Sequence, residues 1–234
     1  MAKKESKIEE LLEQPENLIE DIQSGKFEEW FEKYKNIITY VGGGILALVL
    51  VVVGFKYYTV SQNEEGQNAM FQAVYYFEAD SLNKALNGDG NNLGFVDIAS
   101  DYKFTKAGNL ANYYAGVCYL KQGKFEEAID YLQSFSANDI LVQARAYSLI
   151  GDAYMEQNDY ENAASYYKKA SEWKPTKEFT PDYLMKLGLA AELNKDYDLA
   201  VKAYTRIIDE FPNSAKVNDA KKYKGMNEAL AAAN

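Results

Sequence analysis

The sequence contains no histidine and a single cysteine, Cys118, among its 234 residues. Histidine is the side chain that most often serves as a general base or a metal ligand. The serines therefore have no histidine to activate them, and the scattered carboxylates form no recognisable nucleophile and base pair or metal cluster. This composition indicates a protein that is not an enzyme and holds no cofactor or metal. Because one cysteine cannot form an intramolecular disulfide, we interpret Cys118 as a small apolar core residue.

A basic surface is also lacking. The formal net charge is -10, and residues 57–234 carry 18 basic and 25 acidic side chains, a balance of -7. Binding to nucleic acid requires a basic face or a basic run that neutralises phosphates, and neither is present. We therefore expect no nucleic-acid partner.

Motifs for small-molecule binding are absent as well. The segment 87–94 (NGDGNNLG) places its glycines as G-x-G-x-x-x-G, which differs from the G-x-G-x-x-G of a dinucleotide site. A calcium loop that began at Asn87 would need glycine in place of Asn92 and glutamate in place of Ile98. We interpret the segment as a flexible surface loop and expect no small-molecule substrate.

The longest apolar run, Ile37 to Phe55, contains no charged residue and is bounded by Lys33, Lys35 and Lys56. At about 1.5 Å per residue its helix covers most of a hydrocarbon core of about 30 Å, so we predict a transmembrane helix over residues 37–56. One alternative is a buried core helix of a soluble protein. A second is a cleaved signal peptide, but 36 residues precede the run and no A-x-A-like site follows Phe55.

Lysine placement predicts the orientation of this helix, because basic residues near a span resist translocation. On the C-terminal flank, Lys56 is followed by no basic residue until Lys84. The N-terminal flank carries Lys3, Lys4, Lys7, Lys26, Lys33 and Lys35. We expect a cytoplasmic N-terminus and an exported C-terminal domain.

The tail over residues 1–36 carries apolar side chains at helical spacing and acidic residues opposite them. It has two interpretations. The tail lies at the membrane interface with Trp30 and Tyr34 in the aromatic belt, or it docks a cytoplasmic or membrane protein. The candidate face in either case is Phe27, Trp30, Phe31 and Tyr34.

Three glycines, Gly116, Gly151 and Gly188, are separated by 35 and 37 residues, a spacing typical of helical hairpins. The residues around the second glycine closely resemble a consensus tetratricopeptide repeat: Tyr147, Ile150, Gly151, Tyr154, Ala163, Tyr167, Ala170 and Pro175. Small residues let the two helices of a hairpin approach, whereas tyrosines fill the space between hairpins. We predict three repeats, near residues 109–142, 144–177 and 181–214.

The flanks of these repeats also have helical patterns. The apolar pattern over Glu64 to Leu86 predicts a long helix, and the pattern over Phe95 to Lys106 predicts a shorter one. We therefore expect residues 57–108 to form a long helix plus a degenerate hairpin. Residues 215–234 predict a helix that closes the array, with Ser214 as its N-cap. The expected fold is all-α, with a single N-terminal transmembrane helix followed by a tetratricopeptide-repeat solenoid.

The resemblance to tetratricopeptide repeats implies a concave surface made by the first helix of each hairpin. Its usual positions select a mostly apolar set, which suits extended or partly folded polypeptide: Tyr113, Val117, Leu120, Arg145, Ser148, Asp152, Met155, Met185 and Leu189. Family members that clamp a carboxylate use lysine and asparagine where Tyr113 and Val117 stand, so we expect no such clamp. The alternative is that several of these residues only pack against neighbouring helices.

The order of parts resembles the bacterial ancillary Sec translocon subunit family. A short acidic tail is followed by a glycine-containing anchor, then by YYTVSQNEEGQNAMFQAV and by helical hairpins. The resemblance implies a single-pass inner-membrane protein whose periplasmic array meets Sec channel subunits, exported polypeptides or periplasmic chaperones. The rival hypothesis is a tetratricopeptide scaffold for cell-envelope assembly or division complexes.

Overall fold

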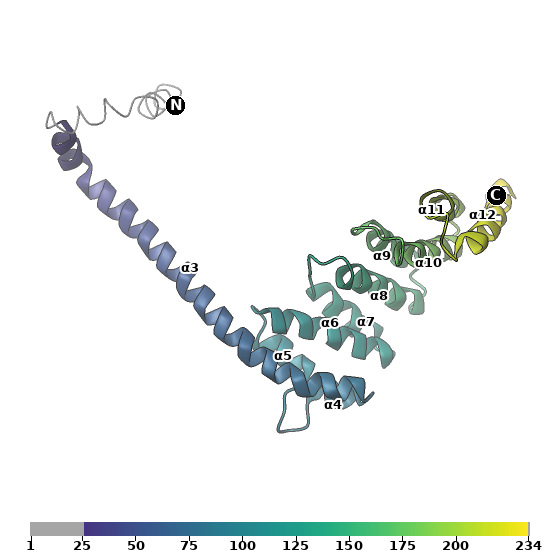
Figure 1. Ribbon diagram of the computed structural model, residues 1–234, viewed down its shortest axis with the longest axis horizontal. Coiled ribbons are helices and arrows are strands. Elements are labelled where there is room, and N and C mark those ends of the chain that lie inside the picture. Colours follow the sequence, from purple (N-terminus) through teal and green to yellow (C-terminus); the bar gives the residue numbers. More distant parts are fainter. Residues whose placement is uncertain (1–25, 234) are drawn as a thin grey trace. The chain divides into compact units, whose positions relative to one another are not determined.

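The computed structural model describes residues 26–233, with side chains from residue 28 onward. All regular elements in this range are helices (Figure 1), which confirms the predicted all-helical class. Their bounds are α3 Lys26–Glu78, α4 Leu82–Asn87, α5 Phe95–Asp101, α6 Lys106–Lys121, α7 Phe125–Ser134, α8 Val142–Glu156, α9 Tyr160–Glu172, α10 Thr180–Leu193, α11 Tyr197–Glu210 and α12 Val217–Ala233. Residues 1–25, most of the predicted tail, lie outside the described residues.

The chain divides into two units, Met1–Tyr58 and Thr59–Asn234, with the division inside α3. In the first unit, α3 contains the one described stretch that is long and apolar enough to cross a membrane, with a mean hydropathy of 2.5 and no buried residue in that window. Its apolar side chains are exposed, for example Leu48 at 65% and Val51 at 70%. The Thr39 hydroxyl donates to the Lys35 carbonyl oxygen at 2.7 Å, so its polar atom is satisfied within the helix.

The second unit begins where the end of α3 packs against α5 and α6. Met70 and Ala73 of α3 are buried in one cluster with Phe95 of α5. The Phe95 ring stacks on Tyr114 of α6 with a centroid distance of 5.1 Å. Asn63 anchors the start of the contact, because its side-chain oxygen accepts from the Ala107 backbone N–H at 3.1 Å.

Two helix ends differ from the predicted ones. The helix predicted to reach Leu86 ends at Glu78, because Asp80 adopts a left-handed backbone with φ of 54° and a separate helix, α4, follows. The helix predicted over Phe95 to Lys106 ends at Asp101. The Thr105 side chain accepts from the Gly108 N–H at 3.1 Å and so begins α6 at Lys106.

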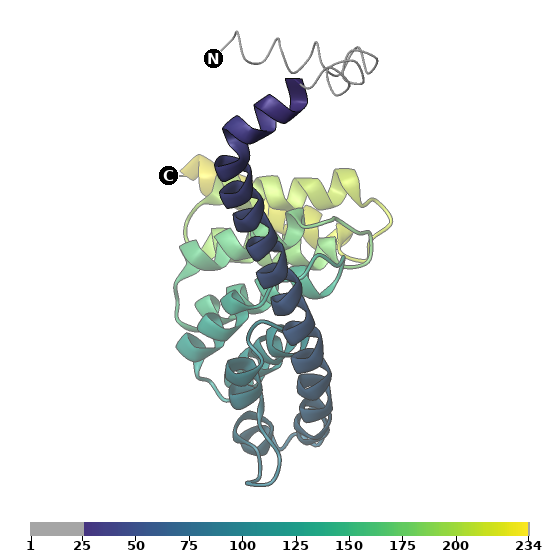
Figure 2. The same cartoon turned by 90° about the vertical axis from the view of Figure 1, so that its left-hand side faces the viewer.

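The hairpins α6–α7, α8–α9 and α10–α11 follow one another along the second unit (Figures 1 and 2). The predicted glycines allow the close approach within each hairpin. A Cβ at Gly116 would lie 2.5 Å from Leu132 Cγ, and one at Gly151 would lie 2.7 Å from Tyr167 Cε1. Gly188 is equally close to Tyr204. A larger residue at any of the three would push the second helix away.

The turn inside each hairpin contains one residue with a left-handed φ. Gly123, Asn158 and Lys195 have positive φ of 74°, 60° and 61°. The next residue in the last two hairpins, Asp159 or Asp196, accepts a backbone N–H three residues later and caps the second helix. Asn158 and Asp159 therefore form the inter-helix turn of the α8–α9 hairpin.

The last helix, α12, packs on α11. Its Tyr223 ring stacks on Tyr204 at 5.7 Å, and the buried Asn227 donates to a Glu192 oxygen of α10 at 2.7 Å. The helix begins at Val217 and not next to Ser214, so the predicted N-cap is wrong. The Ser214 hydroxyl accepts from the Lys216 N–H at 3.2 Å and belongs to the preceding turn.

Candidate functional site

The nine residues predicted for the concave surface lie on the first helix of each hairpin. Tyr113, Val117 and Leu120 are on α6; Arg145, Ser148, Asp152 and Met155 on α8; Met185 and Leu189 on α10. Four of them, Leu120, Asp152, Met155 and Leu189, line one pocket of about 600 Å³, which we name the Asp152 pocket. Its other lining residues are Lys121, Gly123, Phe125, Glu156, Tyr167 and Lys186.

A charged network occupies the wall of the Asp152 pocket. Lys186 of α10 donates to both carboxylate oxygens of Asp152, at 2.6 and 2.8 Å, and Tyr167 of α9 donates to the same carboxylate at 2.7 Å. Burial raises the pKa of Tyr167, and the Asp152 charge raises it further, so this phenol stays a donor. The network thus joins three helices through one carboxylate.

The sequence analysis did not select Lys186. Its side chain also donates to the Ser148 hydroxyl, at 3.3 Å, and Ser148 is 1% exposed. Ser148 is therefore buried, so its side chain is not available to a partner. The sequence does contain a signal for this pair. Lys186 follows Asp152 by 34 residues, which is close to one repeat length, so the two opposite charges fall at similar positions on the first helices of successive hairpins.

The α6 residues have a mixed role. Tyr113, Val117 and Leu120 are half-buried and pack on a core cluster between the hairpins that includes Ile129 and Leu149. Met185 is also half-buried against the core of the last hairpins. These side chains contribute to packing as well as to the surface, so the alternative interpretation applies to part of the predicted set.

Arg145, one of the predicted surface residues, lies near phenols of two other helices. Burial raises the pKa of Tyr113 on α6 and of Tyr183 on α10, and the Arg145 charge opposes the shift at both. The Arg145 residue is exposed. It therefore supplies a positive charge beside an aromatic stretch of the surface.

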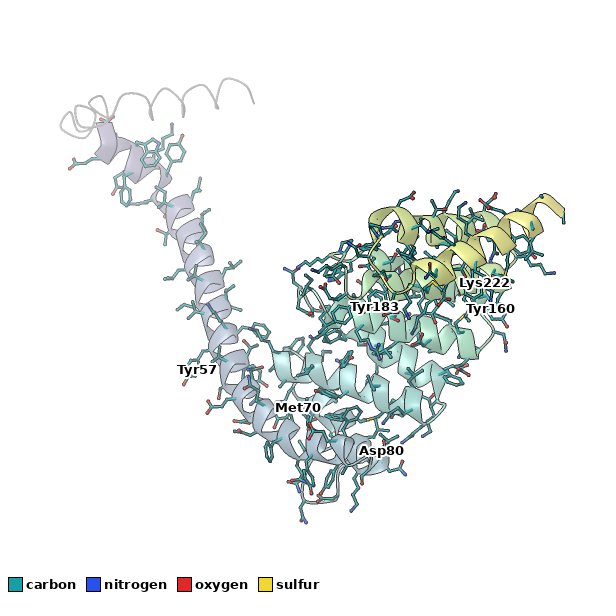
Figure 3. The ribbon with its side chains drawn as sticks, turned by 45° about the vertical axis from the view of Figure 1, so that its right-hand side comes forward. Tyr57, Met70, Asp80, Tyr160, Tyr183 and Lys222 are labelled. Carbon is teal, nitrogen blue, oxygen red and sulfur yellow. The ribbon has the colours of Figure 1, made fainter. Side chains whose placement is uncertain are left out.

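A second pocket, which the sequence analysis did not select, lies between α3 and α6. It has a volume of about 540 Å³, and we name it the α3–α6 pocket. Figure 3 shows Met70, one of the lining residues of this pocket, near the C-terminal end of α3. The lining is Gln67, Met70, Phe71, Val74, Tyr75 and Glu78 of α3, with Lys106, Ala107, Leu110 and Tyr114 of α6.

The predicted tail face is described only in part, because the Phe27 side chain lies outside the described residues. Trp30 and Phe31 are exposed at 50% and 45%. The rings of Trp30 and Tyr34 lie 5.6 Å apart, and the Lys33 amine lies 5.5 Å from the Tyr34 ring centroid. The structure therefore brings Trp30 and Tyr34 together on one side of α3.

The remaining polar groups offer little chemistry. Across residues 28–233, no group of three or more Cys, Asp or Glu side chains is arranged to hold a metal ion. Cys118 is buried, and burial raises the pKa of its thiol to about 12, which makes it a poor nucleophile. The loop 87–94 is held by Asp89, whose carboxylate accepts from Tyr76 and from the Asn91 and Asn92 N–H groups. These bonds keep the pKa of Asp89 well below its usual range.

Comparison with known proteins agrees with this geometry. The tetratricopeptide repeat model matches residues 101–140, 113–177 and 149–215. No curated protein matches the chain. The matched segments contain the three hairpins, their close-approach glycines and all nine residues predicted for the concave surface. Residues 101–215 are therefore an array of tetratricopeptide repeats, a scaffold for protein–protein interaction, and no catalytic family is indicated.

Proposed function

We propose that this protein is a membrane-anchored, non-enzymatic accessory of the Sec translocation channel. The observation that carries the proposal is an exposed, uncharged helical segment followed in the same chain by an interaction array, with one pocket on the array and one beside it. In this proposal the segment 37–56 crosses the inner membrane once. The assignment to Sec is supported by the resemblance in the order of parts.

The orientation is cytoplasmic for the N-terminus and periplasmic for the array. It is supported by the lysine excess before the span. Aromatic residues also flank it, with Trp30 and Tyr34 on one side and the exposed Tyr57 and Tyr58 on the other. A reporter enzyme that functions only after export should be active when fused after Asn234. Activity restricted to a cytoplasmic reporter contradicts the orientation.

The array is proposed to bind channel subunits, exported polypeptides or periplasmic chaperones on its concave surface. Met155 and the exposed Leu189 are the flexible apolar side chains of the Asp152 pocket and suit varied partners. The tail face with Trp30 and Tyr34 is proposed to lie at the membrane interface or to dock a second protein.

Site-specific photo-crosslinking in cells tests the proposal. A photoreactive residue at Met155 or Leu189 should capture channel subunits or exported chains. The same residue at Lys168, exposed on α9 and outside both pockets, should not. Capture of envelope-assembly or division proteins without channel subunits favours the scaffold hypothesis and rejects the Sec role.

A further inference from the structure

The α3–α6 pocket forms where two helices run side by side in the same direction. At one end, a Cβ at Gly66 of α3 would lie 2.9 Å from the Ala107 Cβ of α6. At the other end, the rings of Phe77 of α3 and Tyr114 of α6 lie 5.3 Å apart. At about 1.5 Å per residue, the two contacts are separated by roughly 16 Å along α3 and roughly 10 Å along α6. The pocket occupies the surface above these contacts.

The middle of the pocket is apolar and open. Met70 is buried at its base with 6% exposure, whereas the side chains around it reach solvent. Phe71 is 78% exposed, Tyr75 59% and Leu110 38%. Apolar surface of this kind beside a hollow gains free energy when another apolar group covers it.

The two ends of the pocket carry opposite charges. Lys106 is next to Ala107 and so lies at the Gly66 end, and Glu78 follows Phe77 at the other end. Within residues 28–233, neither Lys106 nor Glu78 forms an ion pair. A ligand that places a carboxylate at Lys106 and an ammonium or guanidinium group at Glu78 complements both ends.

We propose that the α3–α6 pocket binds an extended apolar segment of a polypeptide partner, with an acidic residue at its Lys106 end and a basic residue at its Glu78 end. At about 3.3 Å per residue, roughly three to five extended residues span the pocket. The inference rests on the proposed function, since it assumes that the array binds polypeptide. It extends the binding surface beyond the matched repeats, because six of the ten lining residues belong to α3.

Three dye-labelled nine-residue peptides test the pocket by fluorescence anisotropy with the full-length protein in detergent. The first has five leucine and phenylalanine residues between a glutamate end and a lysine end. The second keeps the apolar centre but has lysine at both ends, and the third has a serine centre. The first should bind tightest, the second more weakly and the third least.

Substitutions at exposed positions locate the binding without disturbing the fold. The double variant Phe71→Ser, Tyr75→Ser should weaken the affinity for the first peptide by about tenfold. Phe104→Ser is the matched control, since Phe104 is 64% exposed and lies outside the lining. Lys106→Glu should reverse the preference in favour of the second peptide, whereas Lys103→Glu should leave it unchanged.

The outcomes separate this inference from the proposed function. Equal affinity of the pocket variants and their controls rejects the pocket but not the array's role. Failure of every apolar peptide to bind, with crosslinking from Met155 intact, also rejects the pocket alone. If Phe71→Ser instead lowers the oligomeric mass in light scattering, a second copy covers this face and the inference is wrong.

Discussion

The two pockets have similar volumes, about 540 and 600 Å³, but they use charge differently. In the Asp152 pocket, the central carboxylate is bonded to Lys186 and Tyr167 from two other helices. In the α3–α6 pocket, the charges stand at the two ends and the centre is exposed apolar surface.

This difference separates stabilisation from binding. A ligand that used Asp152 or Lys186 would have to replace bonds that the protein already makes, which costs about as much as it gains. A ligand in the α3–α6 pocket covers Phe71 and Tyr75 without breaking an internal ion pair. The charged pocket therefore mainly fixes the spacing of the repeats, and its apolar rim of Met155 and Leu189 is the part available for contact.

The largest expected effect comes from placing a large side chain where α3 and α6 are in close contact. Gly66→Leu should destabilise the protein by about 3 kcal/mol, because its Cβ meets Ala107 and Tyr102, which cannot move aside cheaply. It should also abolish peptide binding at the α3–α6 pocket and leave crosslinking from Leu189 intact. Urea unfolding followed by circular dichroism measures the change.

The matched control is Gly225→Ala in α12, where an added Cβ meets nothing within 4 Å. It should stabilise the protein by up to about 1 kcal/mol through helix propensity. Equal effects of the two substitutions would mean that α3 and α6 are not in close contact.

Asp152→Ala should destabilise the protein by about 2 kcal/mol. It removes the acceptor of the Tyr167 hydroxyl, a residue only 3% exposed, and the partner of Lys186. Thermal and urea unfolding check the value. The control, Glu172→Ala, breaks an exposed pair with Lys168 at 4.0 Å and should change stability by less than about 0.5 kcal/mol. A negligible effect of Asp152→Ala would mean that the bonds of Asp152 contribute no more to stability than an exposed ion pair.

The core below the α3–α6 pocket should respond to alkaline pH through Cys118, which is buried in the same cluster as Met70. Burial raises the pKa of this thiol from its ordinary value near 9.0 to about 12. The native state therefore disfavours the thiolate. The resulting stability is present below about pH 9 and is lost as the pH rises toward 12.

Unfolding free energies of the parent protein and Cys118→Ala, measured at a series of pH values, test this titration. Tyrosine titrations are common to both and cancel, so the parent should lose more stability than the variant above pH 9. Parallel pH profiles would show that the thiol is not shielded from solvent.

The smallest effects are expected at the pocket rims. Phe71→Ser and Leu189→Ser should each change stability by less than about 0.5 kcal/mol, since neither side chain is buried in the folded protein. Differential scanning fluorimetry is sufficient to compare them. A large loss at either site would assign that residue to the core and remove it from the candidate surface.

Much of the repeat architecture could be predicted from sequence because it depends on neighbours. Gly151 and Tyr167 are sixteen residues apart in one hairpin, and the turn between them needs only Asn158 and Asp159. Such local rules recur with the repeat, so their spacing is visible in the chain. The helix break at Asp80 is outside the repeats and has no such periodic signal.

The candidate site was less predictable, because its side chains are chosen by contacts between hairpins. Asp152 was selected as a surface residue, yet its bonds to Tyr167 and Lys186 depend on how α9 and α10 pack on α8. Ser148 occupies a family surface position but is buried by the same packing.

The sequence by itself determined the helical class, the repeat period and the uncharged segment at 37–55, because helix formation, hairpin spacing and hydropathy are properties of short stretches. Only the tertiary structure decided which charges pair and where apolar surface stays open. Phe71 and Leu110 come together across one pocket because Gly66 lets α3 approach Ala107 of α6. That contact joins residues 41 positions apart, and no periodicity in the chain encodes it.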